Sequence, residues 1–214
     1  YFVDYATTFK WGGESTFKLN ILDKWILSKL TKLTGDLTKI YEKYDTFSAT
    51  KLLREFAVND LSTWYIRRSR DRISGENEVE RNTALGVLRD VLIAYSKLLA
   101  PIAPFISEEI FKNLISDESV HLQQFPKEDK SLLDEKLMKE MVLVRKIAEA
   151  SHAKRKEAGI KLRQPLAAVL YKLPERLNQD SEKILAEELN VKLIEYKQSL
   201  RSDDLKQSLR SDDL

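Results

Sequence analysis

The apolar positions of this chain recur at helical spacing over most of its length. Between residues 20 and 44 they form one stripe with lysines opposite, and Asn20 is a residue type that caps helix starts. The stripe consists of Leu22, Trp25, Ile26, Leu30, Leu33, Leu37, Ile40 and Tyr44. We therefore expect a long helix over 20–44. Gly35 would lie inside it at a cost of about 1 kcal/mol, so packing must hold that position.

Four further helices are expected, over residues 47–73, 77–99, 104–114 and 131–158. Ser74-Gly75 breaks the first of these and Pro101 stops the second. Pro104 opens the third, because proline is tolerated in a first turn, and Gly159 ends the fourth. Long helices with short connections predict an antiparallel bundle, interrupted by an extended crossover at 119–126.

Beyond residue 161 the hydrophobic period changes. Residues 167–173 and 191–196 have the pattern of strands, and 181–189 that of a short helix, which predicts a small β-α-β element. The fold class is thus mainly α, a helical bundle with a small C-terminal α/β element. The expected organisation has four parts: a connector at 1–19, the bundle at 20–160, the β-α-β element at 161–196, and a tail at 197–214.

The tail is a duplication of nine residues. KQSLRSDDL at 197–205 repeats residue for residue at 206–214. Two copies are too few for a repeat architecture, so a cloning artefact or a recent duplication explains them better than a function does. The chain also begins without methionine, and we expect it to be a fragment of a longer protein.

The charge balance makes local clusters more informative than the total. The chain has 36 Lys and Arg against 34 Asp and Glu, a net charge of +2, so any polyanion site must be local. Cysteine is absent, which excludes disulfides, thiolate catalysis and cysteine-bound zinc and favours a cytoplasmic location. No apolar run approaches the length of a membrane span.

Catalytic signals are missing. No glycine-rich phosphate loop, Ser/His/Asp set or metal-ligand spacing occurs, and the two histidines, His121 and His152, lie far apart. We expect no catalytic residues, no metal and no cofactor in this chain.

The end of the second helix carries four arginines beside two aromatic residues. Indexed at 100° per residue, the stripe of Leu53, Phe56, Ala57, Leu61 and Trp64 runs directly into Arg67 and Arg68. Buried arginine is costly unless paired, so this end either forms ion pairs with Asp60 and Asp71 or faces a polyanion. Trp64, on the stripe, is the better core residue. Tyr65, about 100° away, is the better candidate to stack on a base.

A second basic stretch follows the same arrangement. The stripe of the helix at 131–158 runs from Leu137 through Ser151 into Arg155, and residues 145–163 hold seven basic side chains against two glutamates. The plain alternative is a solvated face whose cations favour a helix C-terminus. The candidate nucleic-acid-binding residues are Trp64, Tyr65, Arg67, Arg68, Arg70, Arg72, Lys154, Arg155, Lys156, Lys161, Arg163 and Gln164.

Five blocks of this sequence together resemble the isoleucyl-tRNA synthetases, a branch of the class I aminoacyl-tRNA synthetases. They are LDKWILSKL at 22–30, DLSTWYIRRSR at 60–70, LAPIAPFISEEIF at 99–111, SVHL at 119–122 and GIKLRQPL at 159–166. The first block resembles the one that opens the family's helical domain, and the third is shared more widely in the class. The other three favour the isoleucine branch. The likeness covers residues 1–196 in the right order and leaves out the tail.

The resemblance implies an anticodon-binding helical bundle that follows a catalytic domain, with a junction element from about residue 161. It implies that the intact protein joins isoleucine to its tRNA with ATP and magnesium, and that this fragment is inactive alone. The implied partner is the anticodon arm of isoleucine tRNA, with no DNA or membrane, bound by a monomer. Some bacterial members carry a cysteine-bound zinc near the C-terminus, and this fragment has no cysteine to hold one.

In this interpretation the arginines and lysines neutralise backbone phosphates, and Tyr65 and Trp64 stack on a splayed nucleotide. Two alternatives stay open. One is the equivalent module of a valine or leucine enzyme, and the other is a helical protein-binding scaffold whose arginines are locked in ion pairs.

Overall fold

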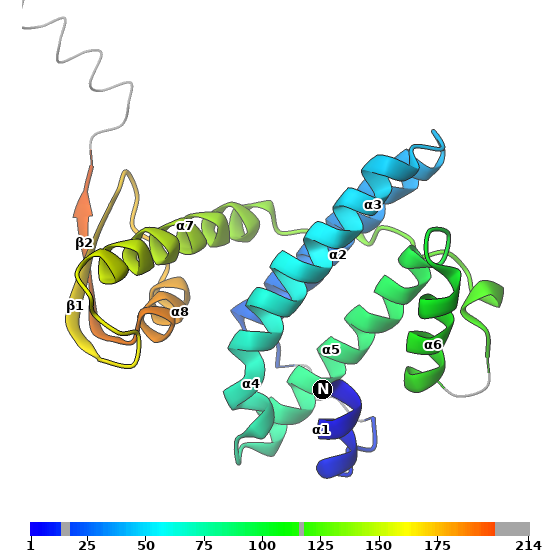
Figure 1. Cartoon of the computed structure of the whole chain (residues 1–214), viewed down its shortest axis with the longest axis horizontal. Coiled ribbons are helices and arrows are strands. Elements are labelled where there is room, and N and C mark those ends of the chain that lie inside the picture. Colours follow the sequence, from blue (N-terminus) through cyan, green and yellow to red (C-terminus); the bar gives the residue numbers. More distant parts are fainter. Residues whose placement is uncertain (14–17, 116–117, 200–214) are drawn as a thin grey trace, which may run out of the picture. The chain divides into compact units, whose positions relative to one another are not determined.

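A computed structural model describes residues 1–13, 18–115 and 118–199 of the chain (Figure 1). Packing divides it into two compact units, Tyr1–Met138 and Lys139–Leu214, and each is described by itself. The first is a helical bundle and the second a β-α-β element with one long helix, which confirms the predicted mainly α fold class.

Helix α2 (Ile21–Tyr41) is the central helix of the first unit. Its start is the predicted one: the Asn20 side chain accepts the backbone N–H of Asp23 at 2.9 Å, and the Asp23 carboxylate accepts that of Asn20 at 3.0 Å. This reciprocal pair satisfies two N–H groups that a helix start otherwise leaves unbonded. The helix ends three residues earlier than predicted, so Tyr44 does not belong to its stripe.

The second predicted helix is a rod of three consecutive parts (Figure 1). Helix α3 (Thr46–Glu55) and helix α4 (Arg67–Ser74) are α-helical, while η1 (Phe56–Ile66) between them is π-helical. A π-helix bonds residue i to residue i+5, so it uses more residues per turn than an α-helix. The buried positions along η1 and α4 are Phe56, Asp60, Leu61, Trp64, Tyr65, Ser69 and Ile73.

Two more helices complete the bundle. Helix α5 (Glu78–Leu99) packs against α2, α4 and α6 (Pro104–Leu114), and Pro104 occupies the first turn of α6 as predicted. The crossover after α6 holds a 3-10 turn, η2 (Val120–Leu122), and a second one, η3 (Lys130–Leu132), lies against α2. The largest fully buried side chains of this unit are Trp25, Tyr65, Phe111, Ile26, Leu37, Leu53, Ile73, Leu85, Leu88 and Leu98.

A short helix, α1 (Phe2–Thr8), lies within the segment 1–19 that the sequence analysis expected to be a connector, and no helix was predicted there. Aromatic rings four residues apart support the helix: the Tyr1 and Tyr5 ring centroids are 4.8 Å apart, and those of Tyr5 and Phe9 are 6.1 Å apart. The Phe9 ring also packs under the Arg81 guanidinium of α5 at 4.3 Å. This contact fixes α1 against the bundle.

The second unit holds most of helix α7 (Glu135–Glu157), followed by β1 (Leu166–Leu173), α8 (Gln179–Leu189) and β2 (Val191–Gln198). The two strands pair in parallel, with Leu166 opposite Val191 and Tyr171 opposite Tyr196. Helix α8 makes the connection between them and buries Ile184, Leu185 and Leu189. The β-α-β element is therefore the one that the change of period predicts.

The packing boundary after Met138 differs from the domain boundary that we expected at residue 160. Side chains of α7 bond to the β-α-β element, which explains the difference. The Glu140 carboxylate accepts the backbone N–H and the side-chain amide of Asn178 at 2.6 and 2.8 Å, and His152 Nε2 lies 3.2 Å from Glu188 Oε1. Helix α7 ends before Gly159, whose φ of +67° is one that glycine adopts without strain.

The duplicated tail contributes little to the described part. Strand β2 takes in Lys197 and Gln198, so it is two residues longer than predicted. Residues 200–214, which hold the rest of the repeat, lie outside the described residues. Within the described ranges, no helix has an apolar stretch long enough to cross a membrane.

Gly35 gives a test of the packing in α2. A Cβ atom at this position would lie 2.8 Å from the Glu128 carboxyl carbon, but Glu128 is exposed and its side chain can move away. We expect Gly35→Ala to raise the free energy of unfolding in urea by about 0.5–1 kcal/mol, because a mid-helix glycine costs that much. Gly159→Ala is the control of opposite sign, with a loss of about 1 kcal/mol from its positive φ. A destabilised Gly35→Ala protein would mean that Glu128 is held in place.

Candidate nucleic-acid interface

A buried carboxylate organises the end of the bundle that carries the arginine cluster. Asp23 is 0% exposed and accepts four hydrogen bonds. The Tyr65 hydroxyl donates to its Oδ1 at 2.7 Å, and the Arg72 guanidinium donates to Oδ1 and Oδ2 at 3.0 and 2.9 Å. The fourth donor is the backbone N–H of Asn20. A carboxylate has about four acceptor positions, so all of them are filled.

The electrostatics of this cluster follow from burial and pairing. Burial raises the pKa of Tyr65 well above its ordinary value, and the charge of Asp23 raises it further. Burial alone would lower the pKa of Arg72, but its hydrogen bonds to Asp23 and the charge of Asp23 outweigh this and raise it. Both groups therefore stay protonated at neutral pH, and Arg72 and Asp23 form a charged pair.

The prediction that Tyr65 stacks on a nucleotide is wrong in this structure, because Tyr65 is fully buried. Trp64 is also buried, as its place on the stripe favoured. Arg72 must be corrected as well: its side chain is 14% exposed and pairs with Asp23, so it holds the fold together and does not reach a phosphate. The π-helical segment is the cause, since its longer turn rotates Tyr65 into the core.

The other three arginines of the cluster differ from Arg72 in their exposure and their partners. Arg67 and Arg70 are exposed, and Arg68 is half-buried. The apolar seam continues through Ser69 and Ile73 and not through Arg67, as the analysis at 100° per residue expected. Arg67 Nε donates to the Thr63 carbonyl at 2.9 Å, and its guanidinium lies 5.9 Å from the Trp64 ring centroid. Asp60, one of the two expected partners, pairs with Lys29 at 2.9 Å.

The second basic stretch belongs to the second unit, so the two clusters lie in different compact units. Its side chains near the end of α7 and in the following turn are exposed. They are Lys154, Lys156, Lys161, Arg163 and Gln164. Exposed guanidinium and ammonium groups at a helix end suit phosphate groups, and this part of the prediction stays a prediction.

Arg155 is the exception, and the prediction that it contacts phosphate needs correction. It is 6% exposed and donates to four backbone carbonyls. Nη1 donates to Lys161 and Gln164 at 3.2 and 2.9 Å, and Nη2 to Leu189 and Asn190 at 2.7 and 3.4 Å. Arg155 thus joins α7 to the turn after it and to the C-terminal end of α8, where carbonyl groups carry partial negative charge.

Sequence reasoning missed two features of the bundle. Asp23 was not singled out, although its spacing of three from Asn20 is the capping-box signal. Tyr44 and Phe47, in and after the α2–α3 turn, are 89% and 80% exposed, and Figure 1 places this turn at the end of the rod opposite α4. Only a prediction that α2 ends before Tyr44 would have indicated their exposure. The sequence does not give that prediction, because Tyr44 fits the apolar stripe of the helix.

Comparison with known proteins gives a consistent result. The family model described as the anticodon-binding domain of tRNA ligase matches residues 23–170. The isoleucine–tRNA ligase of Streptomyces avermitilis is 42% identical over 179 residues, which are 80% of this chain and 17% of that protein. The enzyme of Dehalococcoides mccartyi strain CBDB1 is 43% identical over 81% of this chain and 18% of its own length. That of Thermus thermophilus is 36% identical over 80% of this chain and 17% of its own length. The chain therefore spans less than a fifth of these relatives.

The Asp23 cluster can be tested by comparing two carboxylates. In Asp23→Asn the new amide would direct a donor at Arg72 and leave its buried charge unpaired, so we expect the free energy of unfolding to fall by about 3–5 kcal/mol. Asp36→Asn breaks the more exposed pair with Lys32 and should cost less than about 0.5 kcal/mol. Urea unfolding monitored by circular dichroism measures both. Equal losses would show that the cluster does not hold the bundle.

The raised pKa of Tyr65 predicts a loss of stability at alkaline pH. Below pH 10 the hydroxyl is protonated in the folded and unfolded states, so its contribution is fully present. Above pH 10 only the unfolded state releases the proton, and stability falls by up to about 1.4 kcal/mol per pH unit until the folded pKa is reached. Tyr65→Phe should cost about 1 kcal/mol at pH 8 and show a shallower decline from pH 10 to 11.5. Parallel declines in the two proteins would refute this assignment.

Proposed function

Since the chain belongs to the anticodon-binding domain family of tRNA ligases, we propose that it is the tRNA-binding module of an isoleucine–tRNA ligase. Its partner is then the anticodon arm of isoleucine tRNA. The identity of about 40% to proteins that carry the name isoleucine–tRNA ligase supports isoleucine over valine or leucine.

The proposal assigns the aminoacylation reaction to a longer protein. ATP and magnesium belong to that whole enzyme, and the present chain, in which the sequence analysis found no catalytic signature, is inactive alone. The proposal further places the module in the cytoplasm and has it act as a monomer. The lack of cysteine supports the first of these statements.

The observation that carries the proposal is that the arginines of α4 face two different directions. Arg72 faces inward and is held by Asp23, which fixes the rotation of the helix. Arg67 and Arg70 are then exposed on a rigid element, and no carboxylate of a described residue forms a salt bridge with Arg70. Fixed, exposed guanidinium groups bind phosphates with defined geometry, which positions an RNA without reading its sequence.

A protein-binding scaffold is the second candidate, and two observations favour it. Arg72 and Arg155 are both bonded internally, as a scaffold with locked arginines requires. The remaining basic side chains argue for RNA, because Arg70, Lys154, Lys156, Lys161 and Arg163 are all exposed.

A salt titration tests the proposal. We expect Arg67→Ala/Arg70→Ala to weaken binding of isoleucine tRNA and to reduce the slope of log K against log salt by roughly 0.7–0.9 for each lost phosphate contact. Arg54→Ala, an exposed arginine on α3 before the π-helical segment, is the control and should leave the slope unchanged. An unchanged slope in the double variant would remove α4 from the interface.

Competition among tRNAs tests the amino-acid branch. The chain should prefer isoleucine tRNA over valine and leucine tRNAs, and the preference should disappear when the anticodon stem-loop is deleted. Equal competition by all three intact tRNAs would leave a tRNA-binding module without the proposed branch. If none of the three tRNAs binds, and footprinting shows no protected tRNA segment, the protein-binding scaffold is favoured.

A further inference from the structure

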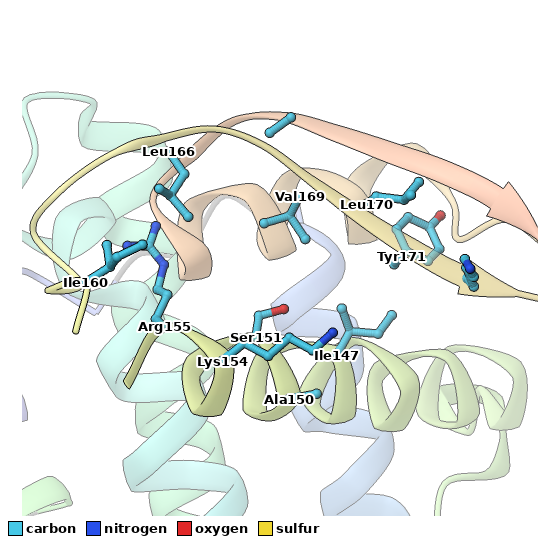
Figure 2. A pocket seen from close by; sticks show the side chains of 12 residues that line it. Ile147, Ala150, Ser151, Lys154, Arg155, Ile160, Leu166, Val169, Leu170 and Tyr171 are labelled. Carbon is cyan, nitrogen blue, oxygen red and sulfur yellow. The ribbon is translucent and has the colours of Figure 1, made fainter. Parts of the chain in front are cut away.

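A groove of about 450 Å³ runs between helix α7 and strand β1, wholly within the second unit (Figure 2). Its volume lies in the range of about 300–1,000 Å³ that small-molecule sites occupy. Figure 2 shows the side chains of Ile147 and Ser151 pointing from α7 towards β1, while the Lys154 side chain lies along the helix. The lining also includes Ala150, Arg155, Ile160, Leu166, Ala168, Leu170 and Lys172.

The charge of this groove has one sign. Its charged lining residues are Lys154, Arg155 and Lys172, and no acidic side chain lines it. Neither Lys154 nor Lys172 forms a salt bridge with any residue that the structure describes. A partly enclosed, uniformly positive groove attracts an anion, because the low-dielectric walls strengthen the field within it.

Arg155 adds an independent sign of a missing partner. Its two terminal nitrogens donate to four carbonyls, but its buried Nε–H has no acceptor, and no carboxylate of a described residue pairs with its charge. Buried donors are nearly always bonded in native proteins, so this one leaves a place for water or a ligand, as do the Nε atoms of Arg72 and Arg81 in the first unit. The guanidinium is more than nine-tenths buried, and this end of the groove is therefore already positive and preorganised.

The walls between the cations are apolar and fixed. Tyr171 is held from both sides: its hydroxyl donates to Glu182 Oε1 at 2.6 Å and accepts the Leu177 N–H at 3.0 Å. Its ring is 4% exposed and packs against Tyr196 at 5.5 Å, so it stiffens β1 but offers no open face to a ligand. The apolar side chains in reach of a ligand are the half-buried Ile147 and Val169. Apolar side chains can pack on the faces of a nucleobase, while the cations take its phosphate.

We propose that the groove between α7 and β1 binds one unpaired nucleotide of the tRNA, with its base against Ile147 and Val169 and its phosphates at Lys154 and Lys172. The inference rests on the proposed tRNA-binding function and adds a site where a base, and not the backbone alone, is contacted. An acidic peptide matches the charge, but it leaves the apolar side chains between the cations without a partner. The nucleotide satisfies both features.

The test fills the groove without changing its charge. Ser151→Trp places an indole where the base would lie, and we expect it to weaken binding of the isoleucine anticodon stem-loop about tenfold at constant salt slope, the size of one lost stacking contact. Ala167→Trp is the matched control, because Ala167 is exposed on the same strand and outside the groove lining. Circular dichroism and thermal melting of the full chain establish that each variant is folded.

A second variant keeps the inference testable if Ser151→Trp does not fold. Lys154→Ala/Lys172→Ala should reduce the salt slope by roughly 0.7 for each phosphate contact, whereas Lys183→Ala/Lys192→Ala, two exposed lysines outside the lining, should not change it. An abasic scan of the loop then identifies the nucleotide. One abasic position should weaken binding to the wild-type chain and have no further effect on Ser151→Trp.

The outcomes separate the two proposals. If the wild-type chain binds the stem-loop and folded Ser151→Trp and the lysine pair variant bind equally well, the groove is not a nucleotide site and the tRNA-binding function stands. If poly-glutamate displaces the stem-loop from wild type but not from Ser151→Trp, the groove takes an acidic peptide and the inference is overturned. If the wild-type chain binds no tRNA, both proposals fall.

Discussion

A buried, fully bonded carboxylate sets the geometry of the bundle. Asp23 lies at the start of α2, yet its two oxygens receive donors from η1 and α4 as well as from the residue that caps its own helix. Removing an ion from water is costly, and the cost is offset only when every acceptor position is filled. The start of α2 and the rod of η1 and α4, whose Tyr65 and Arg72 lie 42 and 49 residues further along the chain, must therefore meet at one point. Once Arg72 is drawn inward there, Arg67 and Arg70 are the arginines left to face solvent.

The second unit also buries a charged side chain, Arg155, but without a carboxylate of a described residue as its partner. Arg155 is buried on the inner face of α7 and bonds only to carbonyl oxygens, of which two lie at the C-terminal end of α8. Carbonyl dipoles at a helix end stabilise a cation, but they do not neutralise its charge. The same residue thus fixes the turn that carries Lys161 and Arg163 and leaves a positive field in the groove beside it. A structural arginine can in this way also form part of a binding surface.

The sequence predicted most element types and several boundaries for physical reasons that act locally. Asn20, Pro104 and Gly159 each set a helix end through the backbone groups next to them, and the structure has each where the sequence placed it. The direction of individual side chains along the arginine-rich rod was less predictable. A single α-helical period from residue 47 to residue 73 predicts these directions, whereas η1 has a longer turn, so every position after Phe56 is rotated from its expected place. Tyr65 and Arg72 moved inward and Arg67 moved outward for this single reason. The local residue types do not predict a π-helical stretch, because its stability comes from the tertiary contacts that it makes possible.

This rotation changes what the arginine cluster can contribute to RNA binding. Phosphate contacts act through charge, so they weaken with salt and tolerate any sequence. Selection among tRNAs needs contacts to bases, and the two aromatic side chains beside the cluster are buried in the core and cannot supply them. If the module discriminates, the base contacts must come from elsewhere, and the groove of the second unit has half-buried apolar side chains, Ile147 and Val169, beside exposed cations. The two proposals together assign different tasks to the two units: contacts to the backbone of the arm for the bundle, and a contact to a base for the smaller unit.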